Sequence, residues 1–150
     1  MDDRIGRYRL IRKIATGGMA EVHLAVAEGP QGFEKTVVVK RVLPHFAEEP
    51  QCVGMFLDEA RRAARLDHPN IVQIFDLGEV DECYFIAMEF IDGRTMRQVQ
   101  RLLYKERKVP PPWFVLRVAC SVCDALEYAH NKLGPDGQPR ELATDAEGAF

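Results

Sequence analysis

The sequence predicts an α+β fold in which five strands and one main helix are followed by two further helices. Strand-like runs come in succession, since residues 8–43 hold three of them and residues 73–89 hold two more. Helical periodicity is confined to residues 50–66, to a segment that starts at residue 95, and to residues 113–130. Strands and helices therefore do not alternate, which argues against a doubly wound, nicotinamide-dependent oxidoreductase.

Length and charge set the first limits on function. The chain has 150 residues, enough for one domain of ordinary size with a real core. Its net charge is −3, from 20 Lys and Arg against 23 Asp and Glu, so no global basic field favours a nucleic acid or an anionic membrane as partner. The first ten residues lack the apolar core of a signal peptide, and no later run has the length of a membrane span. These observations predict a cytoplasmic protein without a nucleic-acid or membrane partner.

The cysteines favour reduced thiols over a disulfide framework, because no secretory signal accompanies them. They are Cys52, Cys83, Cys120 and Cys123. The last two form a C-x-x-C motif inside a helical pattern, with no second cysteine or histidine pair at the spacing of a zinc site. We expect this motif to pack in the core and to have no metal or redox chemistry.

A glycine-bearing turn joins the first two predicted strands. Tyr8 to Ile14 predicts one strand, and residues 21–27 alternate polar or small side chains with apolar ones, as a half-buried strand does. Gly17 and Gly18 lie between them, where small residues let the backbone approach a phosphate chain and where glycine reaches φ > 0 freely. Because a strand follows the turn, and not a helix, the segment is a hairpin lid and differs from the dinucleotide-binding fingerprint.

The third predicted strand contains a lysine that needs a partner. Residues 36–43 are rich in β-branched side chains, as a buried strand is, and Pro44 ends the run. Lys40 follows three valines in this strand. Its ammonium group must therefore either reach water or be paired.

The main helix is predicted over residues 50–66, starting at Pro50 and ending before Asp67-His68-Pro69. Its apolar stripe consists of Val53, Phe56, Leu57, Ala60, Ala63 and Ala64. Glu59 lies beside this stripe and is expected to point toward the sheet. The alternative is a solvated helix face, in which Glu59 joins i, i+3 and i+4 charge pairs among Asp58, Arg61, Arg62 and Arg65.

The remaining elements are two strands and two helices. Residues 73–79 and 83–89 predict strands around a turn at residues 80–82. Thr95 and Gln98 form a capping-box pattern that starts the next helix, and the prolines at 110–112 end it. The last predicted helix, residues 113–130, has apolar side chains around most of its circumference, so we expect burial on several sides.

From Tyr8 to His130, these residues resemble the first half of a protein kinase domain of the bacterial serine/threonine type. The family pattern G-x-G-x-x-G-x-V places Ala15, Gly17 and Ala20 at the three glycines and Val22 at the valine, and V-A-I-K places Lys40 at the lysine. One of the three glycines is present, and the two alanines keep the loop small. The resemblance implies a kinase-like N-terminal lobe, with a five-stranded antiparallel sheet and one main helix, followed by two helices of an incomplete C-terminal lobe.

The resemblance also implies an ATP site. Lys40 and Glu59 would be the catalytic residues, paired so that the lysine holds the α- and β-phosphates. Met88 would be the gatekeeper, three aliphatic side chains would pack on adenine, and backbone groups of Glu89 to Ile91 would face the adenine edge. The implied nucleotide-binding residues are Ile14, Ala15, Gly17, Gly18, Val22, Val38, Lys40, Met88, Glu89, Phe90 and Ile91. Mg²⁺ is implied together with ATP, while the residues that would bind it are missing.

The chain departs from the family pattern after residue 131. Neither the H-R-D motif nor the D-F-G motif occurs in the 150 residues, and the neighbours of Asp145 do not match a catalytic loop. We expect three parts: a kinase-like lobe with its hinge at residues 1–93, partial C-lobe helices at 94–133, and a loop with a frayed tail at 134–150.

Two functions of different classes follow. The first is a truncated serine/threonine kinase domain that binds ATP and has no turnover alone, because nothing is left to hold magnesium or to accept the substrate proton. Its parent would transfer phosphate from ATP to protein serine or threonine. The second is an inactive kinase-like module that docks to a protein partner. An exposed apolar face on the last helix would also favour self-association.

Overall fold

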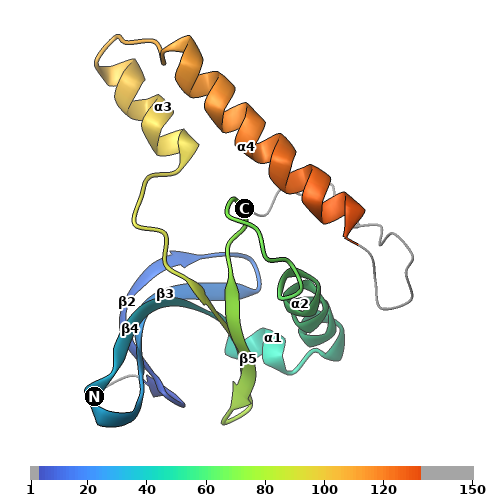
Figure 1. The fold of residues 1–150 in the computed structure, drawn as a ribbon. Helices are drawn as coiled ribbons and strands as arrows, with labels where there is room; N and C mark the ends of the chain where they lie inside the picture. The colour runs from blue at the N-terminus through green and yellow to red at the C-terminus, as the bar shows by residue number, and fades with distance from the viewer. Residues whose placement is uncertain (1–3, 133–150) are drawn as a thin grey trace. The chain divides into compact units, whose positions relative to one another are not determined.

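The computed structural model describes residues 4–132, which form two compact units (Figure 1). The first unit contains residues 4–67 and 72–92, and the second contains residues 68–71 and 93–132. Residues 134–150, with the predicted tail and Asp145, lie outside the described residues.

The first unit is a curled sheet of six strands with two α-helices and a 3-10 turn (Figure 1). Its elements are β1 (Arg4–Ile5), β2 (Tyr8–Thr16), β3 (Ala20–Glu28), η1 (Pro30–Gly32), β4 (Glu34–Val42), α1 (Pro44–Ala47), α2 (Pro50–Ala63), β5 (Ile74–Val80) and β6 (Cys83–Glu89). The strand order is β1-β2-β3-β4-β6-β5, and every neighbouring pair is antiparallel. The predicted α+β class and the antiparallel sheet are confirmed.

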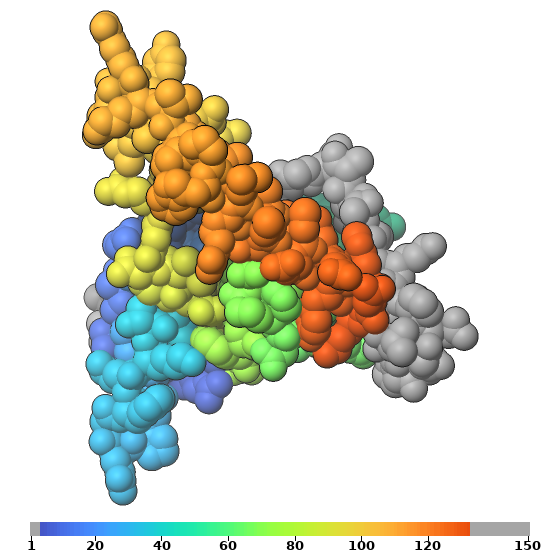
Figure 2. Space-filling view, turned by 45° about the horizontal axis from the view of Figure 1, so that its top comes forward, coloured from blue at the N-terminus to red at the C-terminus, as the bar shows by residue number. Residues whose placement is uncertain are grey.

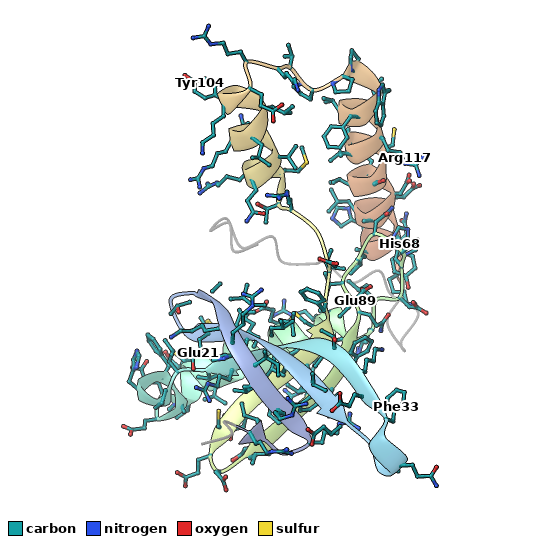
Figure 3. All side chains as sticks on the ribbon, turned by 90° about the vertical axis from the view of Figure 1, so that its left-hand side faces the viewer. Glu21, Phe33, His68, Glu89, Tyr104 and Arg117 are labelled. Carbon is teal, nitrogen blue, oxygen red and sulfur yellow. The ribbon has the colours of Figure 1, made fainter. Side chains whose placement is uncertain are left out.

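Tight turns fix the register of the sheet. Asp81 and Glu82 both have positive φ, of 49° and 61°, between the paired residues Val80 and Cys83. Two central residues with positive φ define a type I′ hairpin, whose twist matches that of the strands. The β3–β4 connection is longer, and exposed Phe33 lies in the part of it that projects from the surface (Figure 2, light blue; Phe33 is labelled in Figure 3).

Each face of the sheet has its own apolar core. One core contains Tyr8, Ala25, Val37, Val39 and Phe85 among its buried residues. The other packs the buried stripe of α2 against the opposite face, and its members are Ala20, Val42, Phe56, Ala60 and Ile86. Phe56 and Ala60 are completely or almost completely buried, so the spacing i, i+4 of the predicted stripe is the surface that anchors α2.

Local differences from the prediction have local causes. All five predicted strands are present, and β1 adds a sixth of only two residues, too short to show a period in the sequence. The main helix ends at Ala63, and a further turn continues to Leu66. The expectation that Gly17 and Gly18 use positive φ is wrong, because the glycines with positive φ in residues 4–132 are Gly6 and Gly32. The hairpin closes instead through a hydrogen bond from the Gly17 amide to the Ala20 carbonyl, at 2.8 Å.

The second unit contains α3 (Met96–Lys105) and α4 (Pro112–Asn131). The capping box that starts α3 is confirmed: the Gln98 amide donates to Thr95 Oγ1 at 3.2 Å, and the Thr95 amide donates to Gln98 Oε1 at 2.9 Å. His68 stacks near Tyr128, with 5.1 Å between ring centroids, which links residues 68–71 to α4.

Helix α4 corrects the prediction of burial on several sides. Ala129 is its one buried residue within the described chain, and the large side chains of Trp113, Leu116 and Leu126 are exposed. Cys120 and Cys123 are exposed as well, so the expectation of core packing is wrong. The reason is that the described elements leave this helix surface uncovered. None of the helices within residues 4–132 combines the length and the hydropathy that a membrane span requires.

Candidate functional site

The predicted sheet residues share one face of the sheet. In the ladder, Val22 lies opposite Lys40 and Lys40 opposite Ile86, while Val38 lies opposite Leu24 and Met88. Side chains of directly opposed residues project from the same face, and so do residues i and i+2 of one strand. Val22, Val38, Lys40 and Met88 therefore form one patch.

Leu24 and Ile86 belong to the same patch, and sequence reasoning missed both. The alternation in β3 and β6 carries the signal for them, because each is two residues from a predicted member.

Lys40 is held between the sheet and helix α2. Its Nζ lies 3.1 Å from Glu59 Oε1 and 3.3 Å from Oε2, so the ammonium donates to both oxygens of the carboxylate. The same Nζ lies 5.7 Å from the ring centroid of Phe56, one turn earlier on α2, and the ring face attracts the cation. The structure thus contains the predicted ion pair, and the alternative in which Glu59 joins only its helix neighbours is not what is seen.

This ion pair contributes little to stability. The side chains of Lys40 and Glu59 are 26% and 61% exposed, and ion pairs in such surroundings are worth about 0–1 kcal/mol. A partly exposed ammonium keeps donor capacity for another anion, because it has three N–H groups and, among residues 4–132, one carboxylate partner. The pair can therefore orient Lys40 toward a phosphate without being needed for the fold.

The glycine turn leaves its outer surface open. The Leu43 amide donates to the Met19 carbonyl at 2.9 Å, which ties the turn to the end of β4. A Cβ placed on Gly18 would meet no atom within 4 Å, and one on Gly17 would come no closer than 3.5 Å, to the Ala20 oxygen. The space beside the turn is free within the described residues, as the approach of a phosphate chain requires.

The predicted hinge is only partly available for hydrogen bonding. The Glu89 amide already donates to the Gln73 carbonyl at 2.8 Å, and a Glu89 carboxylate oxygen accepts from the Gln73 amide at 3.3 Å. Of the Glu89 backbone groups, the amide is therefore used within the sheet, and the prediction for the backbone of Glu89 to Ile91 now rests on the other groups. Phe90 and Ile91 follow the end of β6, and Ile91 is 58% exposed.

The N-terminal edge of the patch is exposed. Ala15 lies opposite Val22 in the ladder, and Ile14 lies at the register shift between Lys13 and Ala15. Ile14 is 43% exposed. The bulge, which separates Ile14 from regular alternation, is a feature that periodicity cannot reveal. In the first unit the patch is apolar, with Val38 and Ile86 buried, and cationic at Lys40.

A charged cluster occupies the opposite face of the same strands. Glu21 precedes Val22 and so points the other way, where it contacts Lys13 at 3.2 Å, Arg41, and His23 Nε2 at 3.2 Å. Burial raises the pKa of Glu21, but hydrogen bonds from Arg41 and Lys13 outweigh that effect and lower the pKa to about 2. These contacts hold Glu21, labelled in Figure 3, on the sheet face opposite to that of Val22.

The patch fits a nucleotide better than it fits a metal ion. A cation with free donors, a turn without bulky side chains and an apolar surface are the parts that phosphates and a flat base require. Within residues 4–132 no group of three or more His, Cys, Asp or Glu could hold a metal ion.

Comparison with known proteins gives consistent results. The family model of the protein kinase domain matches residues 8–133. The tyrosine-protein kinase MasK of Myxococcus xanthus is 48% identical over 134 residues, and the serine/threonine-protein kinase PrkC of Bacillus subtilis is 34% identical over 143 residues. The chain also resembles the PknI kinase domain of Mycobacterium tuberculosis, with a TM-score of 0.68 and 31% identity.

The matches cover most of this chain but a much smaller share of each relative. The MasK match covers 89% of this chain and 21% of MasK, and the PrkC match covers 93% of this chain and 21% of PrkC. The PknI match covers 87% of this chain and 51% of that kinase domain. The chain thus spans about a fifth of the length of these curated relatives. Since the family model matches most of its residues, the chain belongs to the protein kinase family.

Proposed function

We propose that this chain binds ATP as the nucleotide-holding part of a bacterial serine/threonine protein kinase domain. The observation that carries the proposal is the ion pair between Lys40 on β4 and Glu59 on α2, with 3.1 Å between Nζ and the carboxylate. Lys40 lies opposite Val22 in the ladder, two residues after the glycine turn closes at Ala20. In this reading Lys40 donates to the α- and β-phosphates, and Glu59 orients the Lys40 side chain.

The other predicted residues have roles in the same proposal. Val22, Val38 and Ile14 cover the adenine faces, Met88 limits the depth of the slot, and the small residues Ala15, Gly17 and Gly18 lie over the phosphates. Since the Glu89 amide is used within the sheet, the adenine edge is assigned to the backbone of Phe90 and Ile91 and to the Glu89 carbonyl. The lobe and hinge at residues 1–93 and the helices at 94–133 remain our proposed division of the chain.

This stretch alone is proposed to bind nucleotide without transferring phosphate. Transfer depends on positioned magnesium and on a group that accepts the proton of the substrate hydroxyl. The H-R-D and D-F-G motifs that supply these groups do not occur in the 150 residues. Phosphate transfer by this purified stretch, lost on Lys40→Ala, would overturn this part of the proposal.

Thermal unfolding with and without Mg-ATP tests nucleotide binding. A ligand at a hundred times its Kd stabilises by about 2.7 kcal/mol, which corresponds to a rise in Tm of roughly 5–10 °C for a chain of this length. We expect this rise for the unchanged chain and no rise for Lys40→Ala. Lys35→Ala is the matched control, since Lys35 lies on the same strand and contacts Phe75, outside the patch. An equal rise in all three proteins would refute the role of Lys40.

Two further candidates have specific support. MasK, the relative with 48% identity, is named a tyrosine-protein kinase, so tyrosine is the competing acceptor. Phosphoamino-acid analysis of the parent kinase distinguishes the two hydroxyl classes. The second candidate is an inactive docking module, favoured by the exposed apolar side chains of α4, which would also allow self-association. A cooperative unfolding transition without any ATP-dependent shift would support docking over nucleotide binding.

A further inference from the structure

Helix α3 carries a stripe of positive charge that the kinase site does not use. Its members, the α3 stripe, are Arg94, just before the helix, and Arg97, Arg101 and Lys105 on the helix, and all four are exposed. At 100° per residue the three helical members fall within an arc of about 80°. The four side chains line one shallow surface groove together with Gln98 and Tyr104. In Figure 3 many of the side chains on the side of α3 that carries Tyr104 end in nitrogen.

No acidic side chain of the same segment neutralises the positive charges of the stripe. Residues 94–105 contain no Asp or Glu, and within the described chain none of the four cations makes a salt bridge. Like charges at i and i+4, as in Arg97–Arg101 and Arg101–Lys105, destabilise a helix by about 0.2–0.5 kcal/mol per pair. On α2, by contrast, Arg61 is paired with Asp58 at 3.1 Å. The stripe therefore costs α3 stability, and a bound anionic partner would offset that cost.

The spacing of the cations matches an extended acidic peptide. Four residues along a helix rise about 6 Å, and two residues along an extended strand rise about 6.6 Å. Carboxylates at every second residue of an extended segment would therefore meet Arg97, Arg101 and Lys105 in turn. Arginine binds carboxylates through two parallel N–H···O bonds, which adds geometric selectivity.

Two other anionic partners fit less well. Single-stranded nucleic acid is bound by several aromatic stacking platforms along a basic groove, and this groove has one aromatic side chain, Tyr104. A membrane surface is bound by helices that bury a broad apolar face in the lipid. On α3, Val99 and Leu103 are half-buried, which leaves Met96 and Leu102 as the exposed aliphatic side chains of the helix.

We propose that the α3 stripe docks an acidic, extended segment of a protein partner, with carboxylates at alternate residues. The inference goes beyond the proposed nucleotide binding, because it adds a surface that recognises an acidic peptide independently of ATP.

Fluorescence anisotropy with the purified chain tests the docking directly. The probe is a labelled twelve-residue peptide (about 40 Å extended) of alternating glutamate and serine, and the reference peptides replace glutamate by lysine or glutamine. We expect the glutamate peptide alone to bind, with affinity that falls as salt rises. Arg97→Gln/Arg101→Gln should weaken binding at least tenfold. The matched control Arg61→Gln/Arg62→Gln removes two exposed charges from α2 and should bind like the unchanged chain.

The design separates this inference from nucleotide binding. A second variant, Arg94→Gln/Lys105→Gln, should weaken peptide binding as well, so a folding defect in one variant does not decide the result. Peptide binding retained in Lys40→Ala while the Mg-ATP shift is lost would support the α3 stripe as a separate surface. Equal peptide binding by both stripe variants and the control would overturn the inference. So would tighter binding to an oligonucleotide or to anionic vesicles than to the glutamate peptide.

Discussion

Gly78→Ala is expected to destabilise the chain by about 1–3 kcal/mol, the usual cost of forcing an extra methyl group into a packed core. Gly78 lies on β5 directly opposite Phe85 on β6. A Cβ at position 78 would lie 2.8 Å from Cζ and 2.9 Å from Cε1 of Phe85. The ring has little room to move, because Phe85 is 5% exposed and its ring lies 5.5 Å from that of Tyr8 in an edge-to-face contact.

Whether Gly78→Ala lowers or raises the free energy of unfolding shows which dominates, steric overlap with Phe85 or the entropy of the unfolded chain. Without a clash, replacing glycine by alanine inside a strand would stabilise by roughly 0.5–1 kcal/mol through chain entropy. Gly54→Ala is the control for that term, since a Cβ on Gly54 of α2 would meet no atom within 4 Å. We expect Gly54→Ala to raise the free energy of unfolding and Gly78→Ala to lower it.

Urea unfolding measures both variants, with a changed midpoint and an unchanged m-value as the signature of altered stability. Phe85→Leu removes the ring that the new methyl group meets. The double variant Gly78→Ala/Phe85→Leu should therefore be less destabilised than the sum of the two single variants, by at least about 0.5 kcal/mol. Additive effects, or a more stable Gly78→Ala chain, would refute the packing argument.

Three further predictions concern charged and hydrogen-bonded groups. Glu59→Gln should change the free energy of unfolding by less than about 1 kcal/mol and abolish the Mg-ATP shift in Tm. The control Asp58→Asn, on the same helix, should keep the shift. A retained shift in Glu59→Gln would contradict the role of the ion pair. Tyr8→Phe should lower the free energy of unfolding, measured in urea, by about 1.5–3 kcal/mol, because the hydroxyl of the buried Tyr8 donates to Asp76 at 2.8 Å. A loss below about 0.5 kcal/mol, the lower limit for a hydrogen bond, would show that water replaces this hydrogen bond. The hydrogen bonds from Arg41 and Lys13 hold the pKa of Glu21 in the folded chain at about 2, below its ordinary value of 4.5. Its contribution to stability, on the order of 3 kcal/mol, is therefore complete above pH 4.5 and is lost as the pH falls toward 2. Glu21→Gln should flatten this acid limb of the unfolding profile, and an unchanged limb would refute the low pKa.

Much of the architecture could be predicted because short-range sequence patterns indicate the individual strands and helices. Alternation predicts β3, the β-branched run predicts β4, and Thr95 with Gln98 predicts the start of α3. The two-residue β1 and the bulge at Ile14 could not be predicted, since they depend on pairing with a neighbouring strand.

The site shows the same limit. Val22 and Val38 could be assigned to one surface from alternation and family resemblance, but the Glu89 amide could be known to be occupied only when Gln73 was seen beside it. The exposure of Cys120 and Cys123 on α4 also depends on which elements cover that helix. The net charge of −3 does not indicate the α3 stripe, because a total over the whole chain hides a local cluster of four cations.

Local sterics and the periods 2 and 3.6 make three features predictable from the sequence: the order of strands and helices, the glycine turn, and the residue types of the candidate nucleotide site. The 3.1 Å between Lys40 Nζ and Glu59, 19 residues later in the chain, could be known only from the three-dimensional packing. The same holds for the burial of Glu21 among cations on the opposite face. Distances between residues far apart in the chain are set by how the sheet curls and where α2 packs, and these depend on all the core contacts together.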